Sequence, residues 1–396
     1  MGVDRRERFR LGRQVRLADL HQNPYPLLKR LQEEEPISWV SEVNAWFVTR
    51  RTDMLAILLD STTFSAASAG SFLENTLGRT MLSTDGIEQR RLRHPFQAAF
   101  APKAVQTHMA DRIAVAAHAI IDQFNAEGHG DLKTSFADQL ALWTAMEMLG
   151  LPIEDFTQVR HWFTAISQAL GNFAHDLQVR ERGQAAAASF GAYALPHLHR
   201  LRHEPDGSLL AALASSDEMT EEEILSAARL IIFGGLETTS AMLANTIWAL
   251  LSHPAQYEAV LAYPDLLSQA IEESLRWEAP VQSCTRYVTR PITMHGVEFS
   301  PGDMVQGMVG AANRDPEHFT QPDVFNLWRA NAKDHLSFAI GKHFCLGAAL
   351  ARLEGQVGLT LLFERLPEVQ LDPAHPSIPA GHEFRSPPSL HALWKA

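Results

Sequence analysis

The sequence predicts a mainly helical protein with a minor β-sheet region, folded as a single domain over residues 1–396. Helical periodicity dominates the middle of the chain, and β-like runs are confined to short regions near both ends. No internal repeat, Pro/Ser-rich linker or charge run divides the sequence, although its length alone would allow two or three domains. With 46% hydrophobic residues, the chain can bury a large core.

The N-terminal part predicts a helix followed by a small strand pair. Pro24 and Pro26 precede a leucine-rich stretch, which is typical of a helix entered through proline. Residues 37–40 and 45–49 are rich in β-branched and aromatic side chains, which predicts two short strands. Residues 65–80 contain glycines and small side chains without a clear period. They predict a long loop with short helical pieces, and such loops often carry function.

The central part predicts a series of helices. Helical patterns cover residues 53–59, 105–171 with a break near 150–152, 184–202, 220–251 and 265–277. Thr220, followed by Glu221, Glu222 and Glu223, has the chemistry of a helix N-cap with an acidic first turn. This cap predicts the start of a long helix that runs to about Leu251. After Pro280 the pattern changes, and short strands are predicted at residues 287–288, 292–294, 297–299 and 304–305.

Charge and hydropathy exclude several classes of partner. The formal net charge of −12 argues against nucleic acid. Residues 1–13 are polar and basic without an apolar centre, so they predict neither a signal peptide nor an anchor. Later apolar runs, such as 230–236, are too short or interrupted to span a bilayer. Two cysteines cannot form a disulfide framework, and we expect a cytoplasmic protein without membrane contact.

Residues 338–347 read Phe-Ala-Ile-Gly-Lys-His-Phe-Cys-Leu-Gly, and an apolar-periodic helical stretch follows at once. A cysteine at a helix start lies where free backbone N–H groups favour a thiolate over a thiol. A single thiolate held in this way can be an axial ligand to haem iron. The alternative is a buried structural cysteine in a glycine-rich turn.

The long predicted helix contains adjacent glycines, Gly234 and Gly235, which are unfavourable in a helix interior. The Thr238 hydroxyl can hydrogen-bond the carbonyl of Gly234 and open the helix locally, beside Glu237. Leu230, Gly234 and Thr238 share one helical face, so they can line one cavity. Alternatively, the glycines allow close helix packing and Glu237 faces solvent.

These stretches resemble motifs of the cytochrome P450 family. The pattern F-x-x-G-x-H-x-C-x-G around Cys345 is similar to the family's haem-binding loop, with Ala339 at a position where the family usually has glycine, which we expect to be a mild change. The segment around Glu237 and Thr238 resembles its oxygen-activating helix. Glu273-x-x-Arg276, with Arg329, resembles its structural ion-pair group. The likeness extends over nearly the whole chain and matches the soluble bacterial type.

The resemblance implies roles for individual residues. Cys345 would bind the iron of haem b, Thr238 would hydrogen-bond the iron-bound dioxygen, and Glu237 would relay protons. Glutamine at position 89 replaces a frequent histidine of the family, but it can still donate a hydrogen bond. The expected haem contacts are Arg93, Arg286 and His343 at the propionates, together with Gln89, Phe338, Gly347 and Gly234. Cys284 is expected to be a small buried hydrophobe.

The predicted substrate lining is mostly apolar: Phe72, Leu73, Leu77, Leu230, Phe233, Val281, Gln282 and Pro387. It favours a lipophilic small molecule such as a terpenoid, steroid, fatty acid or polyketide. Phe384-Arg385 and Arg79 are candidates for binding a carboxylate, although surface arginines are the commoner case.

The resemblance implies a haem-thiolate monooxygenase that inserts one oxygen atom from O2 into a C–H or C=C bond. Electrons would come from a separate ferredoxin and its reductase, with a basic docking face at Lys342, Arg352, Arg90, Arg91 and Arg93. A monomer is expected. Three alternatives stay open: a peroxide-driven hydroxylase on the same fold, a non-catalytic haem sensor, and a cysteine hydrolase using Cys345 and His343.

Overall fold

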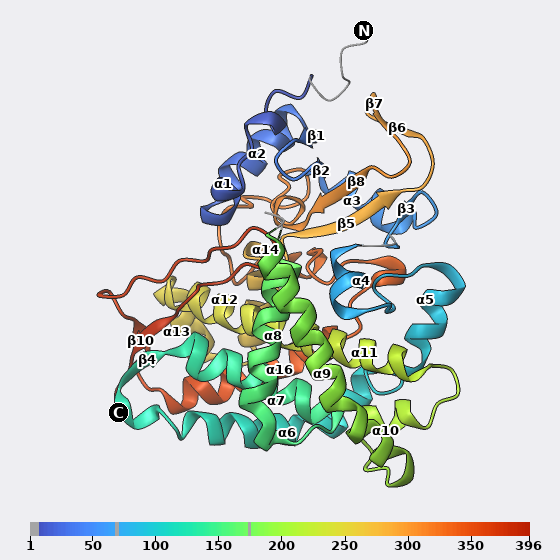
Figure 1. Cartoon of the computed structure of the whole chain (residues 1–396). Coiled ribbons are helices and arrows are strands. Elements are labelled where there is room, and N and C mark those ends of the chain that lie inside the picture. The colour runs from blue at the N-terminus through green and yellow to red at the C-terminus, as the bar shows by residue number, and fades with distance from the viewer. Residues whose placement is uncertain (1–7, 68–70, 173–175) are drawn as a thin grey trace. The chain divides into compact units, whose positions relative to one another are not determined.

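The computed structural model of the chain describes residues 8–67, 71–172 and 176–396, and its elements are labelled in Figure 1. The described residues cluster into two compact units. The first contains residues up to 67 together with 253–345 and 378–388, and the second contains residues 68–252, 346–377 and 389–396. The single domain expected from the sequence stays a prediction.

The first unit is organised around a five-stranded sheet with the strand order β1-β2-β8-β5-β3. Its strands are β1 (Ile37–Val40), β2 (Ala45–Val48), β3 (Phe64–Ser65), β5 (Ser283–Val288) and β8 (Met304–Met308). Strand β2 pairs antiparallel with β1 and parallel with β8, so N-terminal and C-terminal segments share one sheet. A separate hairpin joins β6 (Ile292–Met294) to β7 (Val297–Phe299).

Aromatic side chains form the core beside this sheet. The fully buried Trp46 ring makes edge contacts with Phe9, Trp39 and Phe299 at centroid distances of 5.1 to 5.2 Å. Its indole N–H donates to Asp303 at 3.0 Å, which satisfies its one polar atom. The helices of this unit are α1 (Leu17–Gln22), α2 (Tyr25–Glu34), α3 (Arg51–Leu59), α13 (Pro254–Ala262), α14 (Leu266–Trp277) and α15 (Val309–Ala312).

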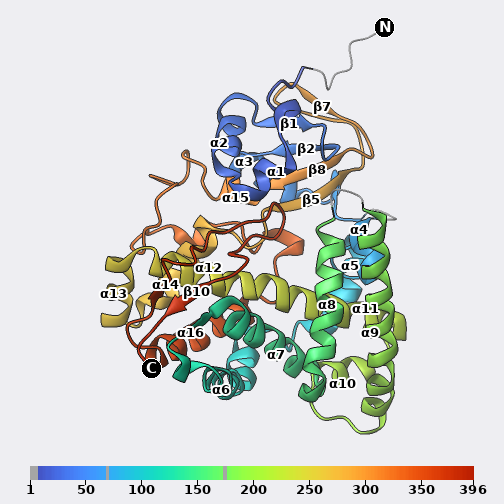
Figure 2. The same ribbon diagram turned by 60° about the vertical axis from the view of Figure 1, so that its left-hand side comes forward.

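The second unit is mainly helical. Its helices are α4 (Phe72–Leu77), α5 (Gly86–Arg93), α6 (Pro102–Ile121), α7 (Asp138–Leu149), α8 (Phe156–Leu170), α9 (Leu177–His203), α10 (Leu209–Ala214), α11 (Glu221–Phe233), α12 (Ser240–Leu251) and α16 (Ala348–Arg365). Figure 2 shows α8 and α9 side by side, and Phe163 and Phe190 join them with ring centroids 5.0 Å apart. A small antiparallel sheet of β4 (His129–Asp131), β10 (His391–Leu393) and β9 (Gln370–Leu371) completes the unit.

The predicted helical class and the main elements are confirmed. Thr220 caps α11 through a reciprocal capping box with Glu223, and Pro24 immediately precedes α2. The short strands β3, β4 and β9 were not predicted. Strand β4 lies within residues 105–171, where helical periodicity dominates, and β3 and β9 have two residues each. Strand β5 begins at Ser283, before its predicted start, since its pairing with β8 continues to Met308.

Helices α11 and α12 form one continuous helical segment, Glu221–Leu251. This corrects the expectation that the later apolar runs are too short or interrupted to span a bilayer. By length and a mean hydropathy of 1.2 it could cross a membrane, although 61% of its most apolar window is buried inside the protein. Core helices of soluble proteins have the same composition.

Candidate functional site

In the first unit, the loop around Cys345 closes on itself. The Cys345 backbone N–H donates to the Phe338 carbonyl at 2.9 Å, and that of Phe344 donates to Gly341 at 3.1 Å. Gly341 has φ +72°, and a Cβ there would lie 3.3 Å from the Leu58 carbonyl, so a side chain is strained at this position. The loop leaves Cys345 exposed, directly before the stretch that becomes α16. Gly347 is the N-cap residue of that helix.

Alanine in place of glycine at position 339 was expected to be a mild change, but the structure places this residue in a strained conformation. Its φ is +53°, in the left-handed region that disfavours a Cβ atom. An alanine there stores about 1 kcal/mol of backbone strain relative to glycine. The loop is therefore strained at this residue, and neighbouring contacts hold it in place.

Two predicted propionate partners belong to this unit. Arg286 lies on β5, is 6% exposed, and donates to the Thr285 carbonyl at 2.8 Å. Cys284 and Arg286 project from the same face of the strand, because side chains alternate. Half-buried Cys284 packs in one apolar cluster with Ala339, so this face of β5 is turned toward the cysteine loop. His343 is buried within that loop.

The ion-pair group predicted around Glu273 is confirmed. The Glu273 carboxylate accepts from Arg276 at 2.7 and 2.8 Å and from Arg329 at 3.0 and 3.1 Å. All three side chains are buried, and the arginines also donate to backbone carbonyls at Asn313, Pro322 and Thr320. This cluster braces the segment that leads to the cysteine loop.

Sequence reasoning assigned no role to Asn313. Its side chain accepts from the Leu336 backbone N–H at 2.7 Å and donates to Ser337 at 2.9 Å. It is fully buried and fixes the entry into the cysteine loop. The likeness to the family extends over nearly the whole chain, but none of its motifs singled out Asn313.

In the second unit, the long helix opens where the sequence predicted it. Residues Gly234–Thr239 form a π-helical segment, and the Thr238 hydroxyl donates to the Gly234 carbonyl at 2.6 Å. A Cβ on Gly235 would lie 2.9 Å from Ala145 on α7, whereas one on Gly234 would meet nothing within 4 Å. The helix is therefore open beside Gly234, near half-buried Thr238, while Gly235 serves helix packing.

Helix α5 carries the other predicted cofactor contacts of this unit. Gln89 and Arg93 are four residues apart and share one helical face, with Gln89 buried and Arg93 half-buried. Arg91 lies elsewhere on the helix. It donates to Glu88 at 2.7 Å and to Glu223 at 2.5 Å, and it lowers the pKa of Glu223 to about 2. The charge of Arg91 is thus paired within the protein, which weakens its predicted place in a docking face.

The substrate residues predicted in the second unit differ in exposure. Leu77 is fully buried and Phe233 nearly so, whereas Leu73 and Leu230 are half-buried. The predicted substrate contact of Leu77 stays a prediction. The side chain of Phe72 lies outside the part that the structure describes.

In the first unit, two segments predicted to line the substrate meet. Val281 forms a β-bridge with Phe384, and the Gln282 N–H donates to the Glu383 carbonyl at 2.8 Å. Pro387, in the same C-terminal segment, is buried. The Gln282 side chain is 1% exposed and donates to the Ala279 carbonyl at 2.7 Å, so it braces the fold here rather than facing open space.

Arg385 is not the free carboxylate receptor that the sequence allowed. Its guanidinium is buried and donates to Glu278 at 2.6 Å and to the Pro379 carbonyl at 2.8 Å. Arg79, the other candidate, is half-exposed and pairs with Glu88 at 3.1 Å. Arg385 therefore stabilises the fold, because its charge is already neutralised.

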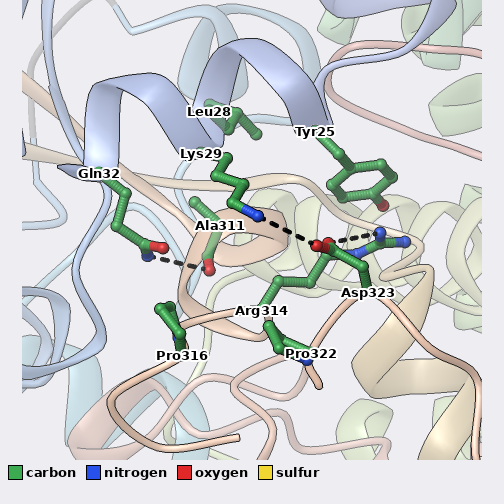
Figure 3. A pocket seen from close by; sticks show the side chains of 9 residues that line it. All are labelled: Tyr25, Leu28, Lys29, Gln32, Ala311, Arg314, Pro316, Pro322 and Asp323. Carbon is green, nitrogen blue, oxygen red and sulfur yellow. Dashed lines mark hydrogen bonds and ion pairs between the residues drawn. The ribbon is translucent and has the colours of Figure 1, made fainter. Parts of the chain in front are cut away.

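A small pocket in the first unit contains none of the predicted site residues (Figure 3). The Arg314 guanidinium stacks over Tyr25 at 3.4 Å and donates to the Trp277 carbonyl at 2.6 Å. Asp323 pairs with Lys29 at 3.6 Å and with Arg314 at 3.4 Å. The charged side chains around this pocket are paired with one another, and none is placed as a catalytic group.

Comparison with known proteins identifies the family. The family model "Cytochrome P450" matches residues 264–390. The chain is 32% identical to the "Biotin biosynthesis cytochrome P450" of Bacillus subtilis, over 88% of this chain and 90% of that protein. It is also 32% identical to the "Mycinamicin IV hydroxylase/epoxidase" of Micromonospora griseorubida, over 92% and 94%. The crystal structure of P450BioI with hexadec-9Z-enoic acid-ligated acyl carrier protein aligns with a TM-score of 0.88 and 31% identity, over 94% of this chain and 99% of that one.

Proposed function

Because the chain belongs to the cytochrome P450 family of monooxygenases, which are haem-thiolate oxidoreductases, we propose that Cys345 binds the iron of haem b. The observation that carries the proposal is the exposed Cys345 thiol at the end of a closed loop. The Cys345 backbone N–H closes this loop by donating to the Phe338 carbonyl, and the loop is strained at Ala339. A thiolate is a suitable donor for haem iron. The open space at Gly234 suits the approach of a flat macrocycle. Phe338 and Gly347 are proposed to contact it.

The reaction we propose inserts one oxygen atom from O2 into a C–H or C=C bond of a lipophilic molecule. Bound haem would supply dioxygen binding and oxygen transfer. Reduction of dioxygen consumes protons. The Thr238 hydroxyl can pass a proton on from Oγ1, the Glu237 carboxylic acid can return one to it, and solvent can then reprotonate the Glu237 carboxylate. The Thr238–Gly234 hydrogen bond supports this role, because it orients the hydroxyl in the helix opening.

The two haem propionates need cationic or donor partners. Arg286, His343 and Arg93 are proposed for this role, with Gln89 as an additional donor. These side chains are buried or half-buried, which supports the assignment. A hydrogen bond between a cationic side chain and a propionate carboxylate is stronger where water is excluded.

The substrate is proposed to be a terpenoid, steroid, fatty acid or polyketide. Leu73, Leu230, Phe233 and Val281 are apolar side chains that fit such a molecule. The names of relatives support the class: one is a hydroxylase/epoxidase, and one was crystallised with a fatty acid on its carrier protein.

A ferredoxin and its reductase are proposed as electron donors to a monomeric cytoplasmic enzyme. Lys342 and Arg90 are the better docking candidates, because Arg91 is engaged by two carboxylates. Charge reversal at Lys342 should slow reduction by ferredoxin, whereas an unchanged rate would remove it from the docking face.

The decisive experiment compares Cys345→Ser with the matched control Cys284→Ser. The wild type and the control should show a Soret spectrum typical of thiolate-bound haem, and the Cys345 variant should lose it. A thiolate spectrum in Cys345→Ser would overturn the proposal. Titration of the ferric wild type with terpenoids, steroids, fatty acids and macrolides should then convert low-spin to high-spin haem for one class, which identifies the substrate.

A further inference from the structure

A partly buried polar network lies at the end of the opened helix segment. Ser240, the first residue of α12, directly follows the π-helical segment Gly234–Thr239. Its hydroxyl donates to Asp138 Oδ1 and accepts from Lys133 Nζ at 2.7 Å, and Lys133 also donates to Asp138. The three polar groups therefore form a closed ring.

This ring is largely shielded from water. Ser240 is 1% exposed, and the side chains of Lys133 and Asp138 are 16% and 18% exposed. Arg160 lies 4.0 Å from the other Asp138 oxygen and adds a second cation. Charged hydrogen bonds in such surroundings are stronger and more directional than those on an open surface.

The ring joins two unusual helical segments. A second π-helical segment, Lys133–Ala137, runs directly into Asp138, the first residue of α7. Asp138 thus follows one π segment as Ser240 follows the other. Since π-helical turns are rare and occur mostly at functional sites, a charged network that connects two of them directly points to a shared role.

Helix α7 also holds the other end of the opened segment. Gly235 approaches Ala145 so closely that an added Cβ would lie 2.9 Å away. Helix α7 therefore contacts Gly235 near the start of the opening and Ser240 directly after it. Without such restraint a π turn can shift along the helix, and this would rotate Glu237 and Thr238 out of position.

We propose that Lys133, Asp138 and Ser240 are positioning residues that hold the helix opening, and with it Glu237 and Thr238, in register for proton delivery. This inference rests on the proposed function. In the coupled reaction, O2, two electrons, two protons and substrate RH give ROH and water. In the uncoupled reaction, the same electrons and protons reduce O2 to hydrogen peroxide. Loss of the network should shift the balance toward peroxide.

The test compares Ser240→Ala and Asp138→Asn with Glu147→Gln in the haem-loaded enzyme. Glu147 lies on the same helix, α7, but pairs with Arg112. We expect amide hydrogen exchange within residues 234–240 to rise about fivefold in Ser240→Ala, the loss of roughly one hydrogen bond. Hydrogen peroxide released per O2 consumed should rise as well. Glu147→Gln should leave both quantities at the wild-type value.

Two variants separate positioning from general stability. Asp138→Asn removes a charge and can loosen the whole unit, but Ser240→Ala keeps the Lys133–Asp138 ion pair. Faster exchange confined to residues 234–240, with more peroxide, supports the proposal. Exchange and peroxide yields in Ser240→Ala equal to those in Glu147→Gln would overturn it. A normal thiolate Soret spectrum in every variant shows that such a failure belongs to the network and not to the haem assignment.

Discussion

The backbone of Ala339 is strained. It has φ +53° within the closed loop that presents Cys345, where glycine would be unstrained. The loop nevertheless forms, because the Ala339 N–H donates to the Leu336 carbonyl at 2.8 Å and its side chain packs against the same apolar cluster as Cys284. Local strain is offset by contacts that the loop makes within its unit.

Replacing Ala339 by glycine should therefore stabilise the protein by up to about 0.5 kcal/mol, since the relieved strain of about 1 kcal/mol exceeds the added entropy of the unfolded chain. Urea denaturation of the same haem-loaded preparation measures the change. Ala351→Gly is the matched control, because Ala351 lies inside α16, where glycine should destabilise by about 1 kcal/mol. Equal losses in both variants would contradict the strain argument.

Glu383 predicts a pH dependence. Burial raises the pKa of its carboxyl from 4.5 to about 7, although the Ser283 hydroxyl that donates to it at 2.7 Å acts in the opposite direction. Between these two values the folded state binds more protons than the unfolded state, so the free energy of unfolding falls as pH rises. The contribution of Glu383 to the free energy of unfolding is complete below pH 4.5 and is lost above about pH 7.

Glu383→Gln should flatten this dependence, because the amide does not titrate. Melting temperatures between pH 5 and pH 8 should fall less in the variant than in the wild type. Glu298→Gln, at an exposed site on β7, is the control and should follow the wild type. If the Glu383 variant also follows the wild-type curve, its carboxyl does not titrate in this window.

At the scale of elements, a buried ion-pair cluster links helix α14 to the segment that leads to the cysteine loop. Glu273 is shared by two arginines, and the burial of Arg276 lowers its pKa. The backbone carbonyls that these arginines bind lie in a segment without regular strands. The cluster therefore takes the place of a sheet in fixing that segment.

Glu273→Gln should destabilise the protein by about 3 to 5 kcal/mol, since it leaves two buried guanidinium groups without their anion. Glu34→Gln is the control, because it removes an exposed ion pair with Arg30 and should change stability by less than about 0.5 kcal/mol. Denaturant midpoints with unchanged m-values provide the comparison. Similar effects of the two substitutions would show that the buried cluster contributes little.

At the scale of the whole molecule, the net charge of −12 and the long apolar helix Glu221–Leu251 are the dominant features. The apolar side chains of this helix, such as Ile224, Ile232 and Ile247, are buried by other parts of the protein. Burial within the protein removes the hydrophobic gain of entering a bilayer.

We therefore expect the folded protein to stay with the aqueous fraction in vesicle flotation. Neutral and anionic vesicles should give the same result, since the acidic total charge offers no attraction to anionic lipid. Flotation with neutral vesicles would show that the helix is accessible to lipid.

The sequence by itself determined the helical class and the approximate bounds of the main helices and strands. It also determined the helix opening beside Thr238 and the two arginine partners of Glu273. These depend on side-chain period, capping chemistry and short spacing, which are local properties, or on a motif long enough to identify the family. The tertiary structure alone decided that Glu278 neutralises Arg385, that Ala339 lies at positive φ, that Gln282 braces the fold, and that Lys133 and Asp138 meet Ser240. Each of these depends on which distant segments come into contact, and neither periodicity nor composition carries that information.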